Sequence, residues 1–304
     1  MGTNIEKKYV FIGDTDSINT ELILKSHNKL KNKVKYILIG RSQELSKDLD
    51  KLSTNLYINE INDPLNFQDY DQNLINIFNI ENISKDKYKN LLNQIHISNF
   101  LSNSTKNDLI TLPINKSVFK KKITFNGMTE YLAKINKSKT LMLMHGEKFS
   151  IIPLTTHINV KKINKYLKKE FIEKELAKIL SQIRRSIFKL DFKEINFLCY
   201  NPHCSEYDTL GDEDKIIRNT IHKYKKINGP YPADSAFIKI NSKKLFISMY
   251  HDQALIPFKI LNKKGLNLTM GLDYRRLSPA HGTAKAIKFK NIADISSYMA
   301  CMLF

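Results

Sequence analysis

The sequence predicts an α/β protein, because apolar runs of strand length alternate with segments that have the three- and four-residue periodicity of amphipathic helices. Residues 9–13 and 34–40 are two such runs, and each leads into a helical pattern. This β–α–β–α order is typical of a parallel or mixed sheet covered by helices. A chain of 304 residues with 42% hydrophobic composition can bury one large or two medium cores.

Later segments continue the alternation. A short strand is expected at 108–116, and residues 140–144 and 149–157 predict a hairpin around the sequence HGEK. Apolar side chains at three- and four-residue steps predict one long helix over 161–188. Further strands are expected at 195–200 and 245–253, with a helix at 212–224 between them. Residues 55–107 are polar and rich in asparagine, and no element is assigned there.

Charge and composition limit the classes of function. The 49 lysines and arginines exceed the 30 acidic residues, which gives a net charge of +19. The lysines are spread from Lys7 to Lys290 among many asparagines and isoleucines, which favours a solvated basic surface over a nucleic-acid site. No apolar run suits a signal peptide or a membrane span, so a cytoplasmic protein is expected. Cys199, Cys204 and Cys301 are expected to be reduced thiols.

Three of the eight histidines follow strand-like segments. His157 comes after IIPLTT, His203 after FLCYNP and His251 after FISMY. Ligands bind at the carboxyl ends of strands in open α/β sheets, and neutral imidazoles bind divalent metals well. A structural role is the common explanation for one such histidine, but three of them, joined by Asp234 and Asp252, predict a metal site. The two aspartates either orient the imidazole rings or ligate the metal themselves.

Basic and amide side chains follow in the last quarter of the chain. Lys259, Asn267 and Arg276 supply an ammonium, an amide and a guanidinium fork, and these groups suit a phosphate or a carboxylate ligand. In so basic a chain, a plain surface charge is the more common role of any single lysine or arginine.

Seven motifs occur in the order found in the 4-hydroxythreonine-4-phosphate dehydrogenase family. They are PINK (113–116), TTHI (155–158), NPH (201–203) with Glu206 following, GPYPADSAF (229–237), YHDQALIPFK (250–259), NLTMGL (267–272) and RLSPAHGTA (276–284). The chain therefore resembles that family over nearly its full length.

The resemblance implies a two-domain α/β/α sandwich like those of isocitrate and isopropylmalate dehydrogenases. Residues 1–125 plus 281–304 are expected to form the cofactor-side domain, and 126–280 the metal, substrate and dimer side. A homodimer with its active site at the subunit interface is implied. The implied activity oxidises 4-phosphooxy-L-threonine with NAD(P)⁺, and the 2-amino-3-oxo acid so formed loses CO₂ to give 3-amino-2-oxopropyl phosphate, a precursor of pyridoxine 5′-phosphate.

The resemblance also implies roles for single residues. Those roles fall on the metal ligands His157, His203 and His251, on the substrate contacts Thr129, Lys259, Asn267 and Arg276, and on the cofactor-side loop His281, Gly282, Thr283 and Ala284. A divalent zinc, magnesium or cobalt ion would lower the pKa of the substrate hydroxyl and stabilise the enolate left by decarboxylation. Asp234, Asp252 and Lys116 are candidates for the proton acceptor, and the sequence does not rank them.

Three segments depart from the family pattern. GDTDSINTE stands in place of G-D-P-A-G-I-G-P-E, so Ser17 and Asn19 occupy positions where close backbone approach favours glycine. After NPH, two glycines and a histidine are replaced by Tyr207, Asp208 and Thr209, and Met128 replaces a substrate-binding histidine. GLDYRRLS also stands in place of G-L-P-F-I-R-T-S.

Three functions are compatible with these departures. One is an active dehydrogenase of the implied kind. A second is a relative acting on another phosphorylated or carboxylated hydroxy acid, and a third is a non-catalytic homologue that binds polyanions.

Overall fold

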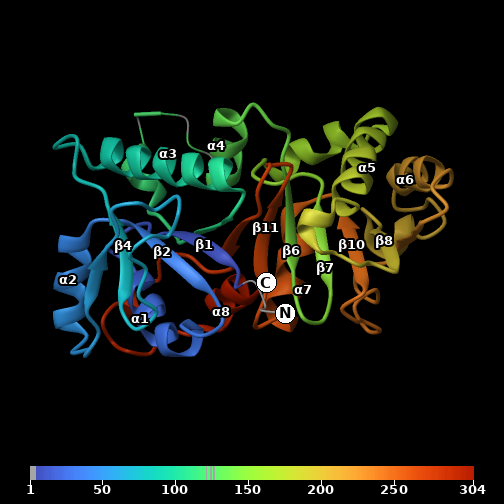
Figure 1. Ribbon diagram of the computed structural model, residues 1–304. Coiled ribbons are helices and arrows are strands. Elements are labelled where there is room, and N and C mark those ends of the chain that lie inside the picture. Colours follow the sequence, from blue (N-terminus) through green and yellow to red (C-terminus); the bar gives the residue numbers. More distant parts are fainter. Residues whose placement is uncertain (1–4, 121, 124, 126) are drawn as a thin grey trace. The chain divides into compact units, whose positions relative to one another are not determined.

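The computed structural model describes residues 5–120, 122, 123, 125 and 127–304, and its contacts divide the chain into two compact units (Figure 1). Unit 1 extends to Lys139 and resumes over Leu272–Phe304, and unit 2 is Thr140–Gly271. These limits lie at 139/140 and 271/272, compared with the 125/126 and 280/281 expected from the sequence. Among the described helices, none is both long enough and apolar enough to cross a membrane.

Unit 1 is built on a sheet whose recorded pairings are all parallel within the described residues. In spatial order its strands are β3 (Ile58–Glu60), β4 (Ile75–Asn79), β2 (Lys35–Gly40), β1 (Lys7–Phe11), β5 (Asp108–Thr111) and β12 (Arg276–Pro279). The sheet therefore presents the carboxyl ends of its strands along one edge, as the predicted β–α–β–α order requires.

Helices cover both faces of this sheet. They are α1 (Asn19–Leu30), α2 (Ser42–Lys51), α3 (Lys87–Thr105), η1 (Lys116–Phe119), α4 (Met128–Ile135), η5 (Lys285–Ile287) and α8 (Ser296–Leu303). In Figure 1, α3 and α4 lie over the face opposite α1 and α8. Alternate strand residues such as Tyr9 and Phe11 form an apolar cluster with Ile95 of α3 and Leu132 of α4. Met128 belongs to this cluster, so its side chain is part of the core.

A buried ion cluster joins the strands of unit 1. Asp108 at the start of β5 accepts from Lys8 Nζ (2.7 Å) and from Arg275 Nε (2.6 Å) and Nη2 (2.8 Å), and all three residues are buried. Glu6, which is 39% exposed, pairs more loosely with Lys8 (3.3 Å) and Arg275 (3.4 Å). Buried charges are tolerated when they are paired in this way, and the loss of Asp108 would leave the two cations with Glu6 alone.

Unit 2 is built on a mixed sheet. In spatial order its strands are β11 (Leu266–Met270), β6 (Leu141–His145), β7 (Ser150–Pro153), β10 (Lys244–Ser248), β8 (Glu194–Leu198) and β9 (Ile227–Tyr231). Strand β6 is antiparallel to β7 and β11, which confirms the predicted hairpin, and β7, β10, β8 and β9 are parallel. The helices are η2 (Val160–Tyr166), α5 (Lys169–Ile183), η3 (Ser186–Phe188), η4 (Pro202–Ser205), α6 (Glu213–Ile221) and α7 (His251–Leu261).

Two predicted elements of unit 2 were wrong in extent. The long helix expected at 161–188 is broken, because Lys168 adopts an extended conformation between η2 and α5. The apolar residues Ile163 and Tyr166 fit the three-residue turn of η2 as well as they fit an α-helix. The strand expected to reach residue 253 ends at Ser248, and His251 is instead the first residue of α7.

Candidate metal and substrate site

Three neighbouring parallel strands of unit 2 carry the three predicted histidines just beyond their carboxyl ends. Strand β10 lies between β7 and β8, with Ser248 opposite Pro153 and Ile247 opposite Phe197. The main chain continues this register past the strands, since Thr155 donates its N–H to the Met249 carbonyl at 3.1 Å. Side chains that follow β7 and β10 at similar distances are thereby placed next to each other.

His157 and His251 are brought together. Their ring centroids are 5.9 Å apart, with an angle of 41° between the ring planes. His251 Nδ1 lies 2.7 Å from Asp252 Oδ1, so Nδ1 is the nitrogen that carries the proton and Nε2 is the one available to a metal. Gln253 donates from Nε2 to the Cys199 carbonyl at 2.8 Å, which ties the first turn of α7 to the end of β8.

His203 lies apart from this pair. It is exposed in η4, and its Nδ1 is 3.9 Å from Asp234 Oδ2. Within the described part of the chain, no three His, Cys, Asp or Glu side chains are close enough together to enclose a metal ion. The structure thus assembles two of the three predicted ligands and places the third beside one of the predicted aspartates.

The segment that carries His203 has an unusual backbone. Six consecutive residues, 203–208, have φ between +44° and +69°, in the left-handed region, and none of them is glycine. Asp214 of α6 is buried below this segment and accepts from the N–H groups of Tyr200 (2.6 Å) and Asn201 (3.0 Å) and from Ser205 Oγ (2.8 Å). These bonds hold a conformation that costs energy for side chains other than glycine.

The predicted phosphate contacts of unit 2 lie on different elements. Lys259 is exposed on α7, two turns after His251. Asn267 lies on β11, and its Oδ1 is buried without a hydrogen-bond donor among the described residues. A buried acceptor without a partner costs free energy unless a ligand or water satisfies it.

The predicted contacts of unit 1 meet directly. Arg276 is buried and donates from Nη1 to Thr129 Oγ1 (3.1 Å) and from Nε to Thr111 Oγ1 (2.8 Å). Burial lowers the pKa of Arg276 to about 10, so the guanidinium keeps its charge at neutral pH. Lys116, the predicted proton acceptor of this unit, is exposed at the start of η1.

Comparison with known proteins decides the family. A family model described as pyridoxal phosphate biosynthetic protein PdxA matches residues 32–304. The chain belongs to the PdxA family. A relative from Hydrogenobaculum named 4-hydroxythreonine-4-phosphate dehydrogenase is 32% identical over 298 residues, covering 95% of this chain and 94% of its own. A relative of the same name from Aquifex aeolicus is 33% identical over 303 residues, covering 95% and 93%.

Solved structures show the PdxA fold. The crystal structure of a 4-hydroxythreonine-4-phosphate dehydrogenase from Klebsiella pneumoniae has a TM-score of 0.79 and 24% identity, covering 98% of this chain and 97% of that one. One from Burkholderia phymatum has a TM-score of 0.76 and 22% identity, covering 99% and 97%. The predicted α/β fold of the isocitrate dehydrogenase type is confirmed.

The altered turn between β1 and α1 lies before the part of the chain that the PdxA model matches. It closes without the family's glycines, because Asn19 donates from Nδ2 to the carbonyls of Ile12 and Pro113, both at 2.8 Å. Buried Asp14 accepts from Lys87 Nζ at 2.8 Å and from the Asn115 N–H at 3.3 Å. Asp14 is the aspartate that GDTDSINTE shares with the family motif, but no sequence pattern indicated that Lys87 would pair with it.

The same turn holds the predicted cofactor-side loop of this PdxA member. The Ile18 N–H donates to the Thr283 carbonyl at 3.1 Å, and Lys285 pairs with Asp16. The hydrogen bond from Lys285 lowers the pKa of the Asp16 carboxyl. Within the loop, His281 Nδ1 lies 2.9 Å from the Gly282 carbonyl, while Ala284 has φ +45° at the start of η5. The loop is therefore anchored to the end of β1.

Proposed function

We propose that the protein oxidises 4-phosphooxy-L-threonine with NAD(P)⁺ to 2-amino-3-oxo-4-phosphooxybutanoate, which decarboxylates to 3-amino-2-oxopropyl phosphate, in the cytoplasmic synthesis of pyridoxine 5′-phosphate. The match of the PdxA model across residues 32–304 carries this proposal. The full-length relatives named for that activity support it. Met128 lies in the core of unit 1, so its replacement of the family's histidine removes a polar contact without opening a gap.

His157, His203 and His251 would hold the metal. The donor set fits a divalent ion, because two imidazoles are adjacent and Asp252 fixes the tautomer of one of them. When bound, a zinc, magnesium or cobalt ion supplies Lewis acidity to the hydroxyl and keto oxygens of the substrate. Asp234, Asp252 and Lys116 remain the candidates for accepting the hydroxyl proton.

Substrate recognition falls to four side chains. By the resemblance to the family, Lys259, Asn267, Thr129 and Arg276 would contact the phosphate and the amino-acid portion of the substrate. Asn267 Oδ1 is buried and accepts no hydrogen bond from the described residues. This supports the role, because the oxygen needs a donor such as the substrate ammonium. The pre-formed Arg276–Thr129 contact fixes the guanidinium fork, which binds phosphate best when its orientation is set in advance.

A second copy of the chain is part of the proposal. Ile256 and Ile260 lie one turn apart on α7 and are 58% and 71% exposed. An exposed apolar stripe on the helix that begins at His251 is typical of an interface. We therefore propose a homodimer with the active site at its interface, in which α7 contributes both to the metal site and to dimer contacts.

Metal content tests the site independently of turnover. Full-length protein loaded with zinc and analysed by mass spectrometry should hold one ion per chain, and His251→Ala should lose it. His222→Ala, at an exposed histidine of unit 2, is the matched control and should keep the ion. An unchanged zinc content in His251→Ala would remove His251 from the proposed ligand set.

A substrate panel tests the reaction itself. We expect formation of reduced cofactor with 4-phosphooxy-L-threonine that a chelator abolishes. Turnover confined to other phosphorylated or carboxylated hydroxy acids would replace this substrate assignment. Salt-sensitive polyanion binding without any turnover would replace the enzymatic proposal altogether.

A further inference from the structure

The carboxylate of Asp214 lies against the segment that carries His203. Asp214 is the second residue of α6, it is fully buried, and both of its side-chain oxygens accept hydrogen bonds. Oδ1 accepts from the N–H of Tyr200 at 2.6 Å, and Oδ2 accepts from the N–H of Asn201 at 3.0 Å and from Ser205 Oγ at 2.8 Å. One carboxylate therefore holds the chain on both sides of His203.

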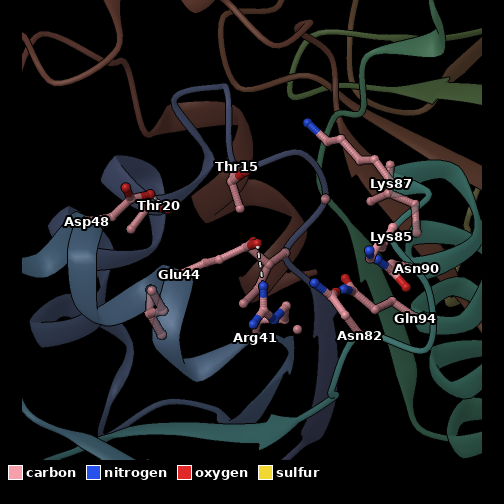
Figure 2. Close-up of a pocket in the computed structure, with 15 residues that line it drawn as sticks. Thr15, Thr20, Arg41, Glu44, Asp48, Asn82, Lys85, Lys87, Asn90 and Gln94 are labelled. Carbon is pink, nitrogen blue, oxygen red and sulfur yellow. Dashed lines mark hydrogen bonds and ion pairs between the residues drawn. The ribbon is translucent and has the colours of Figure 1, made fainter. Parts of the chain in front are cut away.

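An acidic residue in the first turn of a helix commonly serves the helix itself, because its charge stabilises the positive end of the helix dipole. Glu44 in the first turn of α2 fits that role, since it is partly exposed and accepts from the side chain of Arg41 at 3.1 Å (Figure 2). Asp214 differs, because it is removed from water and bonds to the main chain that leads into its helix. Its hydrogen bonds therefore fix the shape of that segment.

The neighbouring acidic residue of α6 belongs to the same network. Glu213 Oε2 accepts from Asn201 Nδ2 at 2.8 Å, and Asn201 Nδ2 also lies 3.1 Å from Ser205 Oγ. Ser205 is fully buried. Buried polar networks with satisfied members rigidify a structure and select one conformation. The first turn of α6 thus fastens both ends of the range 200–205.

This network acts on a backbone that is costly to maintain. Residues 203–208 have φ between +44° and +69°, and none of them is glycine, so each costs energy relative to a helical or extended conformation. Such conformations persist where the surrounding contacts over-determine them, and they cluster at functional sites. Among the predicted site residues, His203 is the one that lies in this run.

We propose that Asp214 is a positioning residue for the metal site: its hydrogen bonds to the chain around His203 set the direction from which that imidazole reaches the metal. The inference rests on the proposed function, which makes His203 a ligand. The side chain of His203 is 64% exposed and its Nδ1 is 3.9 Å from Asp234 Oδ2. Its direction therefore depends on its backbone more than on packing of its ring.

The zinc affinity of the full-length protein tests this role without turnover. Asp214→Asn keeps the volume of the side chain but turns an N–H₂ donor toward one of the two main-chain N–H groups. Titration calorimetry of the metal-free protein should show zinc binding weakened about tenfold or more, the size of effect that follows the loss of groups that orient a metal ligand. Asp212→Asn is the matched control and should bind zinc as the unaltered chain does, because Asp212 is exposed and its side chain makes no capping hydrogen bond.

A double-mutant cycle separates positioning from general damage to unit 2. Asp214→Asn should weaken zinc binding in the unaltered chain and have no effect in a His203→Ala background, where the ligand that it positions is already gone. General damage would instead weaken binding by the same factor in both backgrounds. Ser205→Ala is the milder variant should Asp214→Asn fail to fold. It removes the hydroxyl that Asp214 accepts from, and it should weaken zinc binding about threefold, again only when His203 is present.

Bound cobalt reports the arrangement of the ligands directly, because its visible spectrum depends on coordination geometry. At saturating cobalt, the spectrum of Asp214→Asn should shift toward that of His203→Ala. The spectrum of Asp212→Asn should match that of the unaltered chain.

The outcomes separate this inference from the proposed function. Zinc affinity that is unchanged in folded Asp214→Asn and in Ser205→Ala, or that falls equally with and without His203, would overturn the positioning role even in a protein that turns over its substrate. A loss of affinity that requires His203, in a protein without dehydrogenase activity, would sustain the positioning role and overturn the proposed function.

Discussion

Tyr207→Gly should stabilise the protein, although it removes a large side chain. Tyr207 has φ +61° within the left-handed run and is 98% exposed, so its ring contributes no packing. A left-handed conformation costs a residue other than glycine about 1–2 kcal/mol. Glycine gives the unfolded chain additional freedom that costs about 0.4–1 kcal/mol. The difference predicts a gain of about 0.5–1 kcal/mol in the free energy of unfolding.

Urea unfolding measures this gain as a higher midpoint with an unchanged m-value. Tyr57→Gly is the matched control, because Tyr57 is 73% exposed and does not have positive φ. The control should lose about 0.4–1 kcal/mol, since it changes only the freedom of the unfolded chain. Equal losses in the two variants would refute the strain attributed to residues 203–208.

Three further changes test other parts of the structure. Asp108→Asn should destabilise the protein by about 3–5 kcal/mol in urea unfolding, because it leaves two buried cations with only the partly exposed carboxylate of Glu6, while Asp191→Asn, in an exposed ion cluster, should cost at most about 1 kcal/mol. Asn19→Gly restores the family's glycine but removes two buried hydrogen bonds, so it should cost about 1–3 kcal/mol, and a gain in stability would contradict this account. Burial lowers the pKa of His145 to about 4 from 6.5, so the unfolded chain binds a proton over that range and the folded chain does not. His145 should contribute up to about 3 kcal/mol to the fall in the free energy of unfolding between pH 6.5 and pH 4. His145→Gln should remove that contribution and make the fall smaller, whereas His222→Gln at an exposed site should leave the fall unchanged.

The predictable parts of the fold are those in which apolar side chains carry the pattern. The strands near Tyr9 and Val34 and the hairpin around Gly146 are buried apolar runs, and each was found. Helix α3 was missed because its buried face mixes the apolar Leu91, Ile95 and Leu101 with the polar Asn90, Gln94, Ser98 and Ser102. The polar side chains weaken the hydrophobic periodicity, although the spacing is helical.

The site was predictable where it depends on chain order and unpredictable where it depends on contacts between distant segments. His157 and His251 were selected because both follow strands, and the parallel register of β7 and β10 brings them together. No local pattern could show that Asn19 would close the β1–α1 turn in place of a glycine. Lys87 pairs with Asp14 across 73 residues of sequence, a contact that only the folded sheet creates.

The most direct test of the proposed function follows both products of the reaction. The purified full-length chain, given 4-phosphooxy-L-threonine, a divalent metal and NAD⁺ or NADP⁺, should form 3-amino-2-oxopropyl phosphate and reduced nicotinamide in equal amounts. Absence of both products with zinc, magnesium and cobalt and with either cofactor, in protein shown to be folded and metal-loaded, would contradict the assignment of this PdxA-family chain as a 4-hydroxythreonine-4-phosphate dehydrogenase.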